Sequence, residues 1–116
     1  MDHRDIRLAE EIQHAVMELI PYGLKDPRVE TASVIRVVLT PDLKLAKVYV
    51  EVRGDKKTKQ DAVRVLTHAS GFLRRELAMQ VNVRRIPDLA FYLDVSQEER
   101  QRVEALLDQI DGGKES

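Results

Sequence analysis

Histidines are the residues most able to bind a metal or transfer a proton in this chain, and there are three: His3, His14 and His68. None lies within the short spacing typical of metal sites, and without cysteine no thiolate ligand can complete a set. The sequence also lacks a G-x-S-x-G nucleophile motif, a P-loop and a dinucleotide fingerprint. We therefore expect no catalytic residue, no metal, no cofactor and no small-molecule substrate.

Basic residues, in contrast, gather in the middle of the chain. Residues 53–86 hold nine Lys and Arg against three acidic residues, a local charge of +6, although the net charge of all 116 residues is −1. A patch of one sign attracts an anionic partner even when the total charge is near zero. The candidate RNA-binding residues combine these cations with small residues at a predicted helix bend: Lys56, Lys57, Lys59, Ser70, Gly71, Arg74, Arg75, Arg84 and Arg85. A merely solvated surface is the alternative explanation.

Apolar spacing predicts the elements of the first half of the chain. Residues from Ile6 to Ile20 recur at helical intervals, and Pro21 and Gly23 are expected to end that helix. The nearly unbroken apolar run 34–39 predicts a strand covered on both faces, central in its sheet. Residues 46–52 alternate and predict its hairpin partner, followed by a charged loop with the three lysines.

Two short helices and a third strand are expected next. Thr58 is the predicted N-cap of the first helix, and the Ala69-Ser70-Gly71 segment is a predicted structural kink before a second helix through Leu77. Alternation over 89–95 predicts the strand. A capping box at Ser96–Glu99 predicts a last helix, which reaches Ile110 with an acidic surface.

The order α-β-β-α-α-β-α predicts an α+β fold of two layers, in which a right-handed crossover places the helix pair on one face of a small sheet. We expect one domain over residues 1–111 and a mobile C-terminal tail over 112–116. No stretch is apolar enough to span a membrane or to serve as a signal peptide, so a cytoplasmic, membrane-free location is expected.

Small residues at the bend have two explanations, which the sequence leaves open. They would let a ligand backbone come close to the exposed amides of the second helix, or they would serve tight helix packing. Aromatic residues are few, at 4%, and neither strand carries an aromatic pair for base stacking, so recognition of RNA backbone and shape is expected instead.

Four separated segments resemble ribosome-binding factor A of bacteria. They are Lys25-Asp26-Pro27-Arg28-Val29, the run 38–50 that begins Val-Leu-Thr-Pro-Asp-Leu, residues 71–77 with the sequence Gly-Phe-Leu-Arg-Arg-Glu-Leu, and Arg85-Ile86-Pro87-Asp88-Leu89 with Phe91. The resemblance covers the chain from about Ile6 to Ile110. It implies a type II KH-like fold in which an Ala-x-Gly kink, here Ala69-Ser70-Gly71, replaces the G-x-x-G loop that clamps single-stranded backbone in other KH domains.

The same resemblance implies a function. The family assists late maturation of the small (30S) ribosomal subunit, including processing of the 5′ end of the 16S rRNA precursor, and is associated with growth in the cold. It implies the small subunit and its precursor rRNA as partners, and we expect a free protein that is monomeric. Two other classes remain: an adaptor that contacts a protein through the acidic C-terminal helix, and a nuclease, which the missing metal cluster disfavours.

Overall fold

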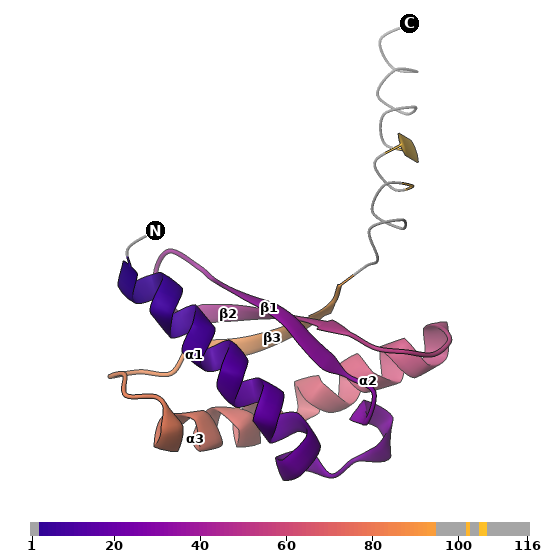
Figure 1. Ribbon diagram of the computed structural model, residues 1–116, viewed down its shortest axis with the longest axis horizontal. Coiled ribbons are helices and arrows are strands. Elements are labelled where there is room, and N and C mark those ends of the chain that lie inside the picture. The colour runs from indigo at the N-terminus through magenta and orange to yellow at the C-terminus, as the bar shows by residue number, and fades with distance from the viewer. Residues whose placement is uncertain (1–2, 95–101, 103–104, 107–116) are drawn as a thin grey trace, which may run out of the picture.

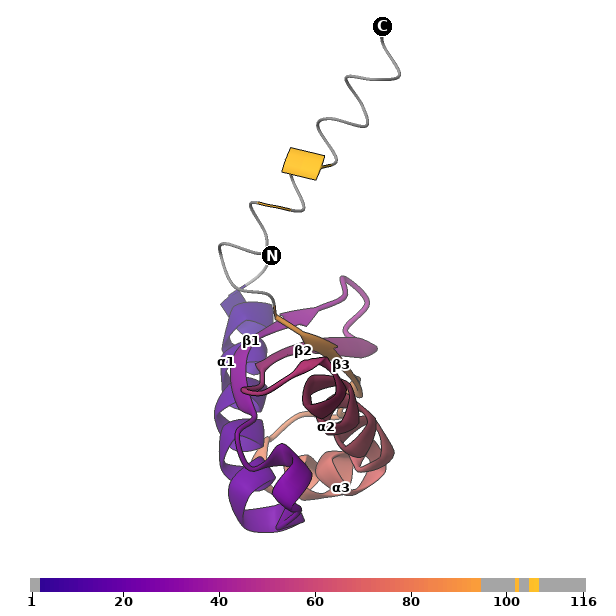
Figure 2. The ribbon, with the colours of Figure 1, turned by 90° about the vertical axis from the view of Figure 1, so that its right-hand side faces the viewer.

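Three helices cover one face of a three-stranded sheet. The computed structural model describes residues 3–94, 102 and 105–106, with the element order α1 (His3–Leu19), η1 (Ile20–Leu24), η2 (Pro27–Val29), β1 (Ser33–Leu39), β2 (Leu45–Glu51), α2 (Lys56–His68), α3 (Ser70–Gln80) and β3 (Asp88–Leu93). Figures 1 and 2 show the helices gathered on one side of the strands. This is the two-layer α+β architecture that the sequence predicts.

The sheet has the strand order β1-β2-β3, with β1 and β2 antiparallel and β2 and β3 parallel. The hairpin and the helical crossover are therefore as expected. The prediction that residues 34–39 form a central strand is wrong, because β2 is central and β1 lies at an edge. A bulge between Val34 and Arg36 explains the misleading run: it leaves both Ile35 and Arg36 exposed, whereas Val34 and Val37 are buried.

The core lies between the sheet and the helices. From the inner face of β2 come Ala46, Val48 and Val50, none of which has any exposed area. Against them pack the apolar sides of the helices, with Ile12, Val16, Leu66, Leu73 and Leu77 also fully buried. Burial on this scale, at about 25 cal/mol per Å² of apolar surface, is what fixes the two helices of the bend on the sheet.

The first helix differs from its prediction at both ends. Ile6 is 45% exposed, and Leu8 takes its place in the buried stripe. At the other end, Pro21 and Gly23 do not stop the helix at once, since the chain continues as the π-helical turn η1 and leaves it at Lys25 with a φ of 52°. On the side of α1 that faces the sheet edge, the Gln13 Nε2 donates to the Ile35 carbonyl at 3.2 Å, so α1 also covers part of the β1 edge.

The start of α2 is also earlier than predicted. Asp55, not Thr58, is the N-cap, and its carboxylate accepts a hydrogen bond from the Thr58 amide at 2.8 Å. Hydrogen bonding by the Thr58 side chain, together with this bond from its amide, lowers the pKa of Asp55. The lysines predicted in a loop consequently lie within the first turns of α2.

Several predictions concern residues outside the described part of the chain. These are the capping box at Ser96–Glu99, most of the last helix up to Ile110, the domain limit at 111 and the tail over 112–116. Within the described residues, no helix is both long enough and apolar enough to cross a membrane.

Candidate nucleic-acid interface

The bend between α2 and α3 is a single residue. Ala69 has φ −87° and ψ 1°, and its amide donates back to the carbonyls of Val65 at 3.0 Å and Leu66 at 3.2 Å. No side chain caps α3, whose first turn closes with the bond from the Leu73 amide to the Ala69 carbonyl at 2.9 Å. The first amides of a helix have no acceptor within that helix. In α3 these are the amides of the residues from Ser70 to Phe72, which lie at the bend.

Gly71 is exposed, and helix packing does not require it. A Cβ built there would meet only the Arg75 Nη1, at 3.7 Å, an ordinary contact with the end of a flexible side chain. Of the two explanations that the sequence leaves open, tight helix packing therefore does not account for Gly71, whereas Ala69 is half-buried and packs against the core. The same contact shows that the Arg75 guanidinium lies over the bend.

Neighbouring arginines of α3 have opposite environments. Arg74 donates from Nε to the Pro87 carbonyl at 3.2 Å and from Nη2 to the Ile86 carbonyl at 3.1 Å, and its Nη1 lies 3.3 Å from Asp88 Oδ1. Arg74 thus ties α3 to the start of β3 and is not an outward-pointing cation as expected. Arg75 is exposed, and no ion pair or hydrogen bond joins its side chain to another described residue.

The remaining predicted cations lie at two separate places. Arg84 and Arg85 are exposed in the connection from α3 to β3. Lys56 and Lys57 are exposed at the start of α2, where Lys59 is half-buried. Figure 1 shows these two segments toward opposite ends of the molecule, with the bend between them. The predicted cations therefore do not form one compact cluster. They form an elongated row along the helical layer, with Arg75 beside Ser70 and Gly71 at its centre, and the lysines of α2 and the two arginines before β3 at its ends.

A shallow depression of about 440 Å³ lies beside the bend, and the site prediction missed its residues. It is lined by Arg28, Arg64 and His68 among others, and each of these three side chains is exposed. Arg64 is 3.6 Å from Asp61, an i, i+3 pair on α2. Helical spacing could have indicated Arg64 and His68, since His68 directly precedes Ala69 and Arg64 lies four residues before His68, on the same side of α2.

Arg28 is held by its own neighbour. The Asp26 carboxylate accepts hydrogen bonds from the Arg28 amide at 2.9 Å, from its Nε at 3.1 Å and from its Nη2 at 2.8 Å. The guanidinium beside it lowers the pKa of Asp26, and the carboxylate raises the pKa of Arg28. This two-residue clamp fixes the direction of one cation at the wall of the depression.

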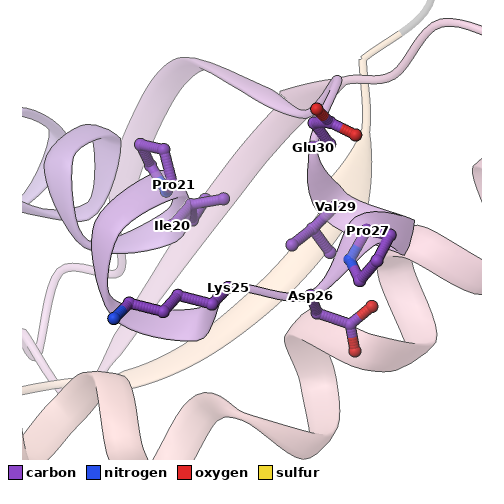
Figure 3. Close-up of a pocket in the computed structure, with 7 residues that line it drawn as sticks. All are labelled: Ile20, Pro21, Lys25, Asp26, Pro27, Val29 and Glu30. Atoms are coloured by element: carbon purple, nitrogen blue, oxygen red, sulfur yellow. The ribbon is translucent and has the colours of Figure 1, made fainter.

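A second hollow, of about 460 Å³, lies between η1 and η2 (Figure 3). Apolar residues Ile20, Pro21 and Val29 line it together with charges of both signs, among them Lys25 and Glu30. It contains none of the predicted site residues. Among the described residues no group of three or more His, Asp or Glu side chains could hold a metal ion.

The fold and this surface define a small α+β domain with an exposed, partly cationic helix bend. The chain belongs to the ribosome-binding factor A family, because the family model "Ribosome-binding factor A" matches residues 4–107. A relative from Solibacter usitatus named ribosome-binding factor A is 37% identical over 106 residues, which cover 91% of this chain and 86% of the relative.

Solved structures agree with this assignment. The crystal structure of ribosome-binding factor A from Thermus thermophilus has a TM-score of 0.69 and 32% identity, over 77% of this chain and 94% of that one. A Thermus thermophilus model of the same factor, fitted into a cryo-electron microscopy map of its complex with the 30S subunit, has a TM-score of 0.62 and 33% identity, over 80% and 93%.

Proposed function

We propose that this chain is a non-enzymatic assembly factor that binds the small ribosomal subunit through RNA and assists its late maturation, including processing of the 5′ end of the 16S rRNA precursor. Membership of the ribosome-binding factor A family supports the subunit as the partner, since a relative of similar fold is described in a 30S complex. The observation that carries the RNA contact is the exposed bend at Gly71 with the Arg75 guanidinium over it.

The chemistry of the row suits a polyanion. Guanidinium groups bind phosphate oxygens in a bidentate manner, and the free amides at the start of α3 add donors and the positive end of a helix dipole. Arg84 and Arg85 extend the cations beyond α3, and Lys56, Lys57 and Lys59 extend them along α2. Binding to the phosphate backbone over this length holds local rRNA in place without reading its sequence.

Co-sedimentation with purified small subunits tests the proposal. We expect the chain to pellet with subunits, to be released by nuclease digestion of the exposed RNA, and to leave precursor RNA uncut when it is incubated alone with that RNA. RNA-independent capture of a single protein would instead favour the adaptor, and turnover of precursor RNA by the purified chain would favour a nuclease.

Substitution of Gly71 separates folding from binding. Gly71→Ala should raise the free energy of unfolding by up to about 1 kcal/mol, because the position is helical and open and alanine is the better helix former. Gly71→Val should keep the native fold yet weaken subunit binding several-fold, because the side chain occupies the space that the RNA backbone needs. Thermal melting and co-sedimentation measure the two effects. Native subunit affinity of Gly71→Val would show that no ligand approaches the bend.

A further inference from the structure

The outer face of the sheet carries a column of three planar groups. Tyr49 on β2 and Tyr92 on β3 stack with ring centroids 5.6 Å apart and planes 29° apart, and the Arg36 Cζ lies 4.2 Å from the centroid of the Tyr49 ring. The register places these residues side by side on β1, β2 and β3. Neither strand carries an aromatic pair by itself, as expected, but pairing of β2 with β3 brings one tyrosine from each strand together, so the sheet does have an aromatic pair.

This column has one occupied end and one open end. Arg36 closes it on the β1 side and is itself held at 3.9 Å from Asp94. Tyr92 ends it on β3, which is an edge strand among the described strands, and is 44% exposed. Because α1, α2 and α3 of the described residues cover the opposite face, a further planar group could extend the stack beyond Tyr92.

The charges around the column favour an anion at one end of the strands. Lys47 lies on the same face, next to Val38 and Ala90, and Lys44 lies in the loop before β2. Neither ammonium group forms an ion pair with a described residue, although the Asp42 carboxylate lies beside Lys44 and accepts a hydrogen bond from its amide at 3.0 Å. Asp88, near them, is paired with Arg74 at 3.3 Å. Glu51 lies at the other end of the face, opposite Ser33, where Asp94 pairs with Arg36.

We propose that this outer face binds unpaired RNA, with a nucleobase stacked on Tyr92 and the adjoining phosphates near Lys44 and Lys47. Aromatic side chains that stack bases beside cations are the usual means of holding single strands. The inference rests on the proposed RNA-binding function and adds to it a second surface, across the sheet from the helix bend. The exposed apolar residues Ile35 and Val38 lie on β1, away from the open end, which disfavours an apolar protein contact at Tyr92.

The test is a titration of the full chain with an unstructured oligoadenylate of about ten nucleotides, followed by proton NMR of the aromatic rings. The spectrum is simple, since the chain has three Tyr, two Phe and no Trp. The ring protons of Tyr92 and Tyr49 should move upfield. Tyr22 is the internal comparison: it is 79% exposed in η1, which contacts Phe72 beside the helix bend, so a shift of Tyr22 alone would report binding at the bend and not on the sheet.

Variants give the size of the effect. Tyr92→Leu should weaken oligonucleotide binding roughly 5- to 150-fold, the loss of one stacked base, whereas Tyr92→Phe should retain it. Unmoved rings in a complex that depends on Arg75 and Arg85 would overturn the inference and leave the proposed function intact. So would persistent contacts of Tyr92 with residues 96–110 of the same chain. Loss of subunit binding by Tyr92→Leu with unchanged oligonucleotide binding would assign the face to a protein and overturn it as well.

Discussion

Replacing Arg74 with alanine is expected to destabilise the fold by about 2 kcal/mol, a fall in melting temperature of roughly 8–12 °C for a domain of about 100 residues. The side chain donates two charge-assisted hydrogen bonds to the Ile86 and Pro87 carbonyls and pairs with Asp88. Pro87 is fully buried and Ile86 is 8% exposed, so the variant leaves two acceptors poorly solvated. Thermal melting followed by circular dichroism measures the change.

Arg75→Ala is the matched control, because it removes the same side chain one position further along α3. Its guanidinium forms no ion pair or hydrogen bond with a described residue, so its melting temperature should stay close to that of the native chain. Equal melting temperatures for the two variants would show that the Arg74 clamp does not stabilise the fold. In a variant with both Arg74 and Arg75 replaced, a loss of subunit binding could not be told apart from a loss of the native fold.

The triple variant R75A/R84A/R85A is expected to lose roughly 100-fold in affinity for the small subunit at about 0.15 M salt. Each arginine is exposed in the row along the helical layer and would neutralise one phosphate. Loss of three such contacts also removes the counterion release that accompanies them. Co-sedimentation or fluorescence anisotropy of a labelled chain gives the dissociation constant.

Removal of other exposed cations provides the comparison. R7A/R53A removes two exposed charges that are not among the proposed RNA-binding residues, from α1 and from the segment after β2. We expect its loss of affinity per charge removed to be much smaller than that of the triple variant. Equal losses per charge would indicate attraction by overall charge and no specific surface.

The periodicity of the sequence predicts the elements and the core well because it records burial directly. The stripe of α2 and α3 contains Ala62, Leu66, Leu73 and Leu77, all fully buried. Edge position is harder to predict: β1 lies at an edge of the sheet, and the bulge between Val34 and Arg36 leaves two successive residues exposed in a run whose apolar sequence indicates burial on both faces. One extra residue changes which side chains face outward, and composition alone carries no sign of it.

The sequence predicts which kinds of residue form the site, but it does not predict which other residues their side chains contact. The cations near the bend could be found from local charge, but the different fates of Arg74 and Arg75 depend on where β3 begins after the loop. The Tyr49 and Tyr92 stack depends on a parallel pairing between residues 43 positions apart. Such long-range register is a property of the folded sheet, and no local pattern encodes it.

The central claim is that exposed cations along the kinked helical layer bind rRNA phosphates. Its most direct test is the dependence of small-subunit affinity on salt for the native chain and for R75A/R84A/R85A. The slope of log affinity against log salt should be steeper for the native chain by about 2 to 3, from about 0.7 to 0.9 for each phosphate contact. Identical slopes for the two proteins would contradict the claim.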